Sequence, residues 1–447
     1  MLNSLFRRLP KGKLNIATKF CNPTNLARQQ QQQISATGYT ASVNRYISTS
    51  ENVHNSDNVR TKSSPADKER IGGLPLELIN KRKLEKSSRT LSTLQNHPIP
   101  AATRTVVSTD ENREFLAVFP DIVNELMEIT NKYSPAEIGS WFARALEYNI
   151  PHGKLNRGLL TVLTYKNLVE SKDLTPENIK KAQILGWCVE ILHGFFLVYD
   201  DVMDNSPTRR GQVCWHKVPQ VGLIALNDAL MMENGVYALL KKHFSSLECY
   251  VHLMELFHEI TFITTCGQSL DLLNANNNVL SFSMEKYNAT VANKTAYYTF
   301  YLPFALAMHL AGIKDPEAFR QSKTILLEMG HFFQVQDDFL DCFGNPEVTG
   351  KIGTDIQDNK CSWLAVVCMQ RANEEQKQIM LDCYGHNDPE KTQKVKDLYI
   401  SLGLPNTYAI YEEESYNMIK THIQQTSRGV PHGIFTQILN KIYQRDA

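Results

Sequence analysis

The amino-acid sequence predicts an all-α protein with one large helical domain. From about residue 111 onward, apolar residues recur with helical spacing in long stretches, separated by short polar or Gly- and Pro-containing breaks. Runs that alternate apolar and polar residues, as strands do, are scarce, and no repeat of fixed period is visible. With 447 residues, of which 42% are hydrophobic, the chain can bury a substantial core.

Each expected helix is a periodic stretch that ends at a polar, glycine or proline break. Thr175, Pro176 and Glu177 form a start signal, because a threonine caps well and a proline is tolerated in the first turn. The expected helices are Asn112–Tyr133, Ala136–Leu146, Gly158–Leu168, Thr175–Asp204, Gly222–His243, Leu247–Leu273, Ser283–Leu310, Pro316–Phe343, Cys361–Met369, Asn373–Cys383, Pro389–Leu402, Asn406–Gln425 and Gly433–Tyr443.

The first 105 residues differ in composition from the rest and predict a disordered leader before a domain at residues 106–447. No Asp or Glu precedes Glu51, whereas seven Lys and Arg residues do. A basic, acid-free segment rich in hydroxyl residues is typical of a mitochondrial transit peptide. The alternative is a plain disordered extension on a cytoplasmic protein, which the Gln29–Gln33 run favours.

Charge, cysteines and hydropathy argue against several classes of protein. Lys plus Arg and Asp plus Glu both total 47, so no net charge attracts nucleic acid. The nine cysteines contain no C-x-x-C pair, which disfavours zinc ribbons. Ala296–Ile313 is the stretch most similar to a membrane span, but it carries Thr299, Pro303 and His309 and is expected to be a buried core helix. No transmembrane segment is expected.

Two aspartate clusters of the form D-D-x-x-D lie within apolar helical stretches. Residues four apart share one helix face, so each cluster concentrates negative charge in an apolar setting. That arrangement is unfavourable unless cations neutralise it, and hard oxygen ligands suit Mg²⁺, which takes further ligands from water and phosphate. The clusters therefore predict a diphosphate held through metal ions. They consist of Asp200, Asp201 and Asp204 and of Asp337, Asp338 and Asp341.

Basic motifs accompany both clusters. A lysine and an arginine one turn apart beside a glycine are a plausible diphosphate anchor, whereas any one such motif by itself is more often a surface ion pair. Lys294 lies in an apolar stretch, where an unpaired ammonium is costly. The motifs are Gly153-Lys154-Leu155-Asn156-Arg157, Arg209-Arg210-Gly211, Lys294-Thr295, Gly350-Lys351-Ile352-Gly353-Thr354-Asp355 and Asp358-Asn359-Lys360.

From about Glu111 to the C-terminus the chain resembles the farnesyl diphosphate synthases, short-chain trans-prenyltransferases, of the animal and insect type. The segments that carry the resemblance are Phe195–Gly211, Gly267–Leu272, Lys294–Pro303 and Phe332–Trp363. The resemblance implies an antiparallel helical bundle with a central cavity, acting as a homodimer. It implies dimethylallyltranstransferase and geranyltranstransferase activity, the joining of isopentenyl diphosphate to dimethylallyl and geranyl diphosphate to make farnesyl diphosphate.

The resemblance also implies roles for individual residues. Three Mg²⁺ ions, with Mn²⁺ as an alternative, would lie between the clusters, and Asp341 would support its cluster through water. Thr295 and Gln334 would lie near the reacting end of the allylic substrate, with Lys294 and Lys351 among the catalytic cations. The implied ligands of the allylic diphosphate are Arg209, Lys294 and Lys351, with Lys360 close by, and Gln268 is a further implied substrate-binding residue. The implied isopentenyl-site residues are Gly153, Lys154, Arg157, Arg210 and His193.

Two aromatic residues before the first cluster bear on product length. Phe196 lies four residues before Asp200, one turn deeper on the same helix face, and Phe195 is beside it. In the family, bulky residues here form a floor that stops growth at fifteen carbons. Ordinary core packing is a compatible interpretation, because a floor is itself packing.

The chain departs from the family pattern at four places, of which His193, His152 and the C-terminus touch the isopentenyl site or its closure. His193 stands where a glutamine is usual, His152 replaces a glycine, Tyr199 is bulkier than usual, and Asp446 makes the C-terminus less basic. These departures leave open a terpene synthase that ionises geranyl or farnesyl diphosphate without isopentenyl diphosphate. A second alternative is a non-catalytic subunit that binds prenyl diphosphates; loss of metal aspartates would mark it, and none is lost.

Overall fold

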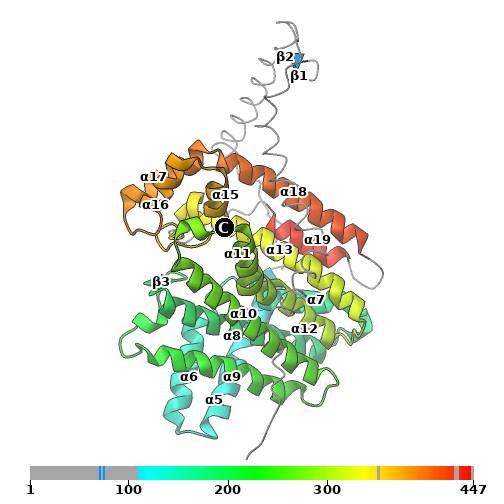
Figure 1. Cartoon of the computed structure of the whole chain (residues 1–447). Helices are drawn as coiled ribbons and strands as arrows, with labels where there is room; N and C mark the ends of the chain where they lie inside the picture. The colour runs from blue at the N-terminus through cyan, green and yellow to red at the C-terminus, as the bar shows by residue number, and fades with distance from the viewer. Residues whose placement is uncertain (1–69, 72–73, 76–108, 350–352, 427–431, 444–447) are drawn as a thin grey trace, which may run out of the picture. The chain divides into compact units, whose positions relative to one another are not determined.

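The computed structural model describes residues 70–71, 74–75, 109–349, 353–426 and 432–443. The chain divides into two units, and the second, Ala102–Ala447, contains the helices drawn in Figure 1. In the first unit, β1 (Arg70–Ile71) pairs antiparallel with β2 (Leu74–Pro75). The rest of the predicted leader and Lys351 lie outside the described residues, so the predicted domain boundary near residue 105 stays a prediction.

The N-terminal half of the second unit is built around α8, which packs against α7 and α9. A short antiparallel hairpin, β3 (Thr208–Arg209) and β4 (Gln212–Val213), follows α8. The helices of this half are α4 (Thr109–Leu116), α5 (Phe119–Asn131), α6 (Ala136–Asn149), α7 (Asn156–Leu168), η2 (Ser171–Asp173), α8 (Pro176–Met203), η3 (Trp215–Lys217), α9 (Ile224–Phe244) and α10 (Tyr250–Ala275).

The C-terminal half is built around the π-helix η5, which packs against both α10 and α13. Helix α13 also contacts α18. The helices of this half are η4 (Val279–Ser281), α11 (Met284–Val291), η5 (Ala292–Tyr301), α12 (Leu302–Leu310), α13 (Pro316–Phe343), α14 (Pro346–Thr349), α15 (Trp363–Arg371), α16 (Glu374–Cys383), α17 (Pro389–Ser401), α18 (Leu404–Gln425) and α19 (His432–Ile442).

The all-α prediction is confirmed, and most expected helices agree closely with the observed bounds. The expected start of α8 holds, because the Thr175 hydroxyl accepts a hydrogen bond from the Asn178 N–H at 3.2 Å. One expected helix, Asn112–Tyr133, is instead two, α4 and α5. The break falls before Pro120, which cannot donate a backbone hydrogen bond and whose ring clashes with the preceding turn.

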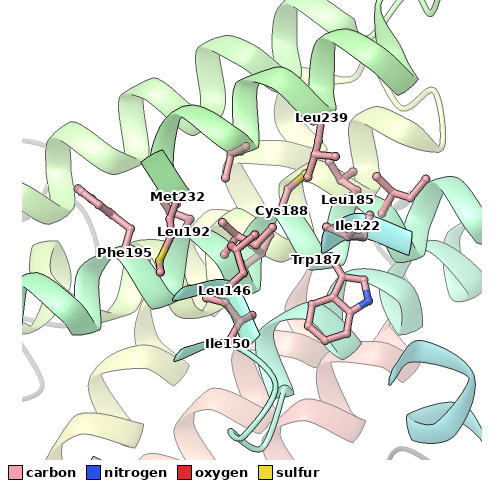
Figure 2. Packing of buried hydrophobic residues seen from close by; sticks show 14 of the residues in the cluster. Ile122, Leu146, Ile150, Leu185, Trp187, Cys188, Leu192, Phe195, Met232 and Leu239 are labelled. Carbon is pink, nitrogen blue, oxygen red and sulfur yellow. The ribbon is translucent and has the colours of Figure 1, made fainter. Parts of the chain in front are cut away.

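The main core lies between α5, α6, α8 and α9. Figure 2 shows apolar side chains from these helices in contact, among them Ile122, Leu146, Trp187 and Met232. Trp187 stacks on Phe115 with ring centroids 4.5 Å apart, and its indole N–H donates to the Phe115 carbonyl at 3.0 Å. Because α8 is covered on nearly all sides, its last turn, which carries the first aspartate cluster, rests on a rigid support.

One described helix, α8, is long and apolar enough to cross a membrane by length and composition, and 83% of its most apolar window is buried inside the protein. The sequence had instead singled out Ala296–Ile313, which the structure divides between η5 and α12. A helix buried in a protein core can be as long and as apolar as a membrane-spanning helix, and α8 is such a helix.

Helix η5 fits tightly between its two neighbours because each neighbour presents a glycine. A Cβ atom on Gly267 of α10 would lie 2.2 Å from the backbone N of Lys294. A Cβ atom on Gly330 of α13 would lie 2.3 Å from the Cβ of Ala296. Both glycines therefore allow the backbone of η5 to approach at distances that no other residue permits. The sequence predicts one continuous helix over Ser283–Leu310. The π-helical section of that stretch lies where η5 passes between the two glycines. π-Helical turns are frequent at functional sites.

We expect Gly267→Ala to destabilise the protein by about 1–3 kcal/mol, the usual cost of forcing a methyl group into a packed interior. Urea unfolding followed by circular dichroism measures this change. The control is Gly433→Ala in α19, where a Cβ would meet nothing within 4 Å and no loss of stability is expected. Equal stability of the wild type and Gly267→Ala would show that α10 can shift away from η5 at no cost.

Candidate active site

The first aspartate cluster lies on the last turn of α8 and is bound by an arginine of the following hairpin. Arg209 donates to Oδ1 of Asp201 from Nε at 2.9 Å and from Nη2 at 2.6 Å, and Nη2 also lies 3.3 Å from Oδ2 of Asp200. Asp201 is buried. A charge-assisted contact of this kind is among the stronger hydrogen bonds, so the guanidinium orients both carboxylates.

Asp200 also contacts α10 and η5. Its Oδ1 accepts from Nζ of Lys294 at 3.2 Å and from Nε2 of Gln268 at 3.1 Å. Burial alone would raise the pKa of this carboxyl, but Lys294, Arg209 and Lys360 outweigh burial and hold the pKa below its usual value. Asp200 is therefore ionised at neutral pH, as a metal ligand must be.

A third carboxylate, Asp271 of α10, is shared by two lysines. Its Oδ2 accepts from Nζ of Lys294 at 2.6 Å and from Nζ of Lys360 at 3.0 Å. Lys360 also lies 3.3 Å from Oδ2 of Asp204. Burial opposes charge on Asp271, yet the two lysines keep its pKa below the usual value. The pKa of Asp204 is instead raised. Burial and the negative charge of Asp200 both favour the protonated form, and the attraction of Lys360 is too weak to offset them.

The second cluster lies on the last turns of α13. Oδ2 of Asp338 accepts from the backbone N–H of Trp363 at 2.7 Å, and Oδ1 accepts from Nε2 of Gln334 at 2.9 Å. Burial raises the pKa of Asp338 to about 7 despite these hydrogen bonds. Asp341 accepts from the backbone N–H of Asp355 at 3.0 Å, and Asp337 is half-buried.

Consecutive residues of η5 connect the two clusters. Lys294 binds Asp200 of the first cluster. The hydroxyl of Thr295 donates to Oε1 of Gln334 at 3.0 Å, and the amide NH₂ of Gln334 in turn donates to Asp338 of the second cluster. Lys360, which follows the second cluster in sequence, binds Asp204 of the first. Lys294, Lys360, Asp200, Asp204 and Asp338, which are far apart in sequence, thus belong to one connected set of contacts.

Two neighbouring arginines at a two-residue turn contact different parts of the protein. Arg210 and Gly211 have φ of +53° and +74°, the values of a type I′ turn between β3 and β4. Arg209 contacts the aspartates, whereas Arg210 donates to the carbonyls of Asn149 and Ile150 at 2.9 and 3.2 Å. A Cβ on Gly153 would lie 2.5 Å from Nη2 of Arg210, so any other residue at this position would require the guanidinium to shift.

Arg157, in the first turn of α7, is held by neutral acceptors. Its Nε and Nη2 donate to the hydroxyl of Thr299 at 3.2 and 2.9 Å, and Nη2 donates to the hydroxyl of Tyr298 at 3.0 Å. The guanidinium carbon lies 4.7 Å from the centre of the Tyr298 ring. These contacts fix the orientation of the guanidinium without cancelling its charge, which suits a site for an anion.

His193 completes the surroundings of Arg157. Its Nε2 lies 3.3 Å from Nη1 of Arg157, and its Nδ1 lies 3.4 Å from the Tyr298 hydroxyl. Because arginine only donates, Nε2 accepts and the ring hydrogen is on Nδ1. Burial, followed by the charges of Arg157 and Arg210, lowers the pKa of His193 well below its usual value. The imidazole is therefore neutral, and its one donor is directed to Tyr298.

The two predicted floor residues lie below the first cluster. Phe196 contacts Phe195 with centroids 5.0 Å apart and meets Tyr298 edge-on at 5.2 Å. Phe195 also packs against Tyr199 at 5.1 Å. The aromatic rings of α8 thus meet η5 one turn beneath Asp200.

The C-terminal helix reaches the predicted isopentenyl-side anchor. Lys441 of α19 donates from Nζ to Oδ1 of Asn156 at 2.9 Å. Burial, and then the nearby charge of Lys154, lowers the pKa of Lys441. Lys154 itself is exposed. The positive charges of Lys441 and Lys154 lie close enough to repel each other, and an anion placed near them would be stabilised.

Comparison with known proteins identifies the family. The family model described as polyprenyl synthetase matches residues 139–402. The chain belongs to the polyprenyl synthetase family. The farnesyl pyrophosphate synthase of Nezara viridula is 50% identical over 339 residues, which are 76% of this chain and 84% of that protein. The human protein of the same name is 47% identical over 345 residues, covering 76% of this chain and 82% of its own length.

The solved structures agree with the sequence relatives. A T. brucei farnesyl diphosphate synthase in complex with a bisphosphonate superimposes with a TM-score of 0.70 and 30% identity, covering 75% of this chain and 99% of that one. The resemblance found in the sequence and the predicted isoprenoid-synthase fold of this polyprenyl synthetase are therefore both confirmed.

Sequence reasoning missed several residues of the site. Asp271 lies in the segment Gly267–Leu272, and its signal was an acidic residue in an apolar helix, three residues after Gln268. Tyr298 and Thr299 lie in the segment Lys294–Pro303, but no role in the site was predicted for them, and Thr299 counted only as a polar residue that argues against a membrane span. Glu190, which accepts from the Gly158 N–H at 2.7 Å beside Arg157, was also missed.

The carboxylates present suit Mg²⁺, the metal that the sequence predicts. Among the described residues, no group of three or more His, Cys, Asp or Glu side chains forms a metal site by itself. Mg²⁺ needs no such cage, because it binds through one or two carboxylates and takes its remaining ligands from water and phosphate oxygens. The buried carboxyls of Asp204 and Asp338, whose pKa values burial raises, would be stabilised in their charged form by such an ion.

We expect Asp271→Asn to lower the polyprenyl synthetase activity (kcat/KM) about 10- to 100-fold, the range typical of residues that support metal and cation ligands. The change leaves Lys294 and Lys360 without their shared counter-charge. Steady-state assays measure it, with Glu177→Gln as a control because that variant removes only an exposed ion pair to Lys181. Wild-type kinetics in Asp271→Asn would show that the lysines do not depend on this carboxylate.

Proposed function

We propose that this polyprenyl synthetase is a farnesyl diphosphate synthase. It joins isopentenyl diphosphate to dimethylallyl diphosphate and then to geranyl diphosphate, which yields farnesyl diphosphate. The observation that carries the proposal is the meeting of both aspartate clusters at Lys294–Thr295, beside a separate group of cations around Arg157 and Arg210. Two groups of cations suit two diphosphates, and the relatives at 47–50% identity carry this activity in their names.

The allylic diphosphate binds on the side of the aspartate clusters. Lys294, Lys360 and Arg209 supply positive charge there, and Gln268 orients Asp200. Mg²⁺, of which we propose three ions, supplies further positive charge that stabilises the leaving diphosphate. As the allylic carbon–oxygen bond breaks, its electron pair leaves with the diphosphate and an allylic cation remains, which Thr295 and Gln334 face from η5 and α13.

The isopentenyl diphosphate binds on the other side of the hairpin. Arg157, Arg210, Gly153 and Lys154 form this site, and His193 acts on it through Arg157. The electrons of the isopentenyl double bond form the new carbon–carbon bond to the allylic cation. The resulting cation loses a proton to the departing diphosphate, so no side-chain base is needed. Lys351, outside the described residues, remains a proposed ligand of the allylic diphosphate.

The full-length protein with Mg²⁺ and geranyl diphosphate should form farnesyl diphosphate only when isopentenyl diphosphate is added. Chelation of the metal should abolish the reaction, and added Mg²⁺ should restore it. Asp200→Asn should lower the rate by about 100-fold or more, whereas Asp121→Asn, at an exposed ion pair with Lys180, should not. Hydrocarbons or alcohols formed from geranyl diphosphate alone would indicate a terpene synthase, and binding without product would indicate a non-catalytic subunit.

We expect Phe196→Ala to lengthen the product beyond fifteen carbons, because truncation opens the contact with Tyr298 beneath the first cluster. Chromatography of the dephosphorylated products measures their length. The control is Phe319→Ala, since Phe319 packs against His309 outside the site. An unchanged product length in Phe196→Ala would remove this residue from the floor.

We also propose that the protein is a homodimer that associates through α10. Val251, Phe262 and Leu273 of this helix are 58%, 71% and 63% exposed and follow one another at intervals of eleven residues. Eleven residues are three helical turns, so the three side chains lie on one face of the helix, about 16 Å apart along its axis. In a two-fold dimer this face would meet its own copy, which would cover the three exposed apolar side chains. Light scattering should give a dimer for the wild type and a monomer for Phe262→Glu.

For residues 1–105 we propose a mitochondrial transit peptide. The support is their basic, acid-free beginning, which contrasts with the balanced charge of the whole chain. A fluorescent protein fused to these residues should be imported into mitochondria. If the fusion stayed in the cytosol, the protein would be cytoplasmic and the segment a plain extension.

A further inference from the structure

Asp228 of α9 is a buried carboxyl group to which none of the roles above applies. It is 1% exposed. Its Oδ1 accepts from Nε1 of Trp141 at 2.9 Å, and its Oδ2 accepts from Nε1 of Trp215 at 2.8 Å. Because an indole only donates and a carboxylate offers two acceptor oxygens, one side chain satisfies two tryptophans. Asp228 thereby joins α6, α9 and η3.

Trp215 is the point at which the arginine-bearing hairpin is fastened to the helices. It lies two residues after β4, and the Cys214 N–H donates to the Pro207 carbonyl at 3.0 Å, which closes the base of the hairpin. The Trp215 ring packs on Tyr148 with centroids 4.9 Å apart, and the Tyr148 hydroxyl donates to the Val213 carbonyl at 2.6 Å. Trp215 itself is buried.

The hairpin needs such a fastening because it cannot hold its own shape. Each strand has only two residues, and an isolated two-stranded hairpin is marginal at best. Its turn places Arg210 at a positive φ, a region that side chains other than Gly, Asn and Asp rarely adopt. The conformation that directs Arg209 and Arg210 to different partners is therefore imposed by the surrounding structure.

We propose that Asp228 is a positioning residue that sets both arginines of the hairpin through Trp215. The proposal rests on the proposed function, in which Arg209 serves the allylic diphosphate and Arg210 the isopentenyl diphosphate. Since the two arginines are consecutive, movement of the hairpin base displaces both at once. Loss of the fastening therefore weakens the binding of both substrates together, although Asp228 contacts neither.

Trp141 offers a matched control on the same carboxylate. Its indole makes a hydrogen bond of nearly equal length to Asp228, but it comes from α6 and not from the hairpin. The Arg144 guanidinium carbon lies 5.5 Å from the centre of the Trp141 ring and 5.4 Å from that of Trp215, and the two ring centres lie 6.1 Å apart. Trp141 is half-buried, whereas Trp215 is buried. The variants Trp215→Phe and Trp141→Phe each remove one donor and leave the other in place.

The experiment compares Trp215→Phe, Trp141→Phe and Asp228→Asn in the full-length protein. The KM for geranyl diphosphate, the KM for isopentenyl diphosphate, kcat and the melting temperature are measured for each. We expect Trp215→Phe to raise both KM values about tenfold, the factor that corresponds to about 1.4 kcal/mol, and Trp141→Phe to leave both within about twofold. Asp228→Asn should raise both as well, because an amide offers one acceptor oxygen to two indoles.

Two results would overturn the proposal. One is a lower melting temperature in Trp215→Phe with both KM values unchanged; the other is an equal rise in Trp141→Phe. If Asp228→Asn does not fold, the comparison of Trp215→Phe with Trp141→Phe still tests the proposal. If the wild type catalyses no condensation, the proposed function fails, and the binding of inorganic diphosphate is measured by calorimetry in place of KM. Weaker binding by Trp215→Phe than by Trp141→Phe would then support the positioning role. Equal binding by the two variants would refute it.

Discussion

Neutralisation of buried negative charge governs the arrangement of this site. Carboxylates from α8 and α10 lie within an apolar bundle, where unpaired charge is costly, and Asp271 solves part of the problem by sharing one oxygen between Lys294 and Lys360. The same lysines then reach Asp200 and Asp204. The lysines thus link η5, α8 and α10 to the segment that follows the second cluster. The charges of this network are therefore set in position by the fold itself.

The proposed isopentenyl side is arranged differently. Arg157 is oriented by the hydroxyls of Thr299 and Tyr298 and by the neutral imidazole of His193. The acidic side chain beside it is Glu190, a buried carboxyl whose pKa burial raises. The unusual His193 fits this scheme, because a neutral imidazole whose Nε2 accepts from arginine orients the guanidinium without competing for the diphosphate.

Much of the architecture was predictable because helices are determined by local spacing. The period of apolar residues and signals such as Thr175-Pro176 placed most helices to within a few residues. The exceptions depend on contacts from elsewhere in the chain. The π-helical section of Ser283–Leu310 occurs where Gly267 and Gly330 admit the backbone of η5, and neither glycine is near it in sequence. Pro120 is a local signal for a helix break, but apolar residues recur with helical spacing on both sides of it, so the sequence predicted one helix where there are two.

The same division applies to function. The sequence by itself determined the chemistry: two D-D-x-x-D clusters and their accompanying cations specify metal and diphosphate, because residue type and helical spacing decide what a helix face can bind. Only the tertiary structure decided the pairing. That Asp271 joins two lysines, that Tyr298 and Thr299 hold Arg157, and that Asp228 anchors Trp215 are contacts between segments 13 to 142 residues apart. A buried acid or tyrosine has the same local sequence signature in a core as in a site, so its partner is known only once the chain has folded.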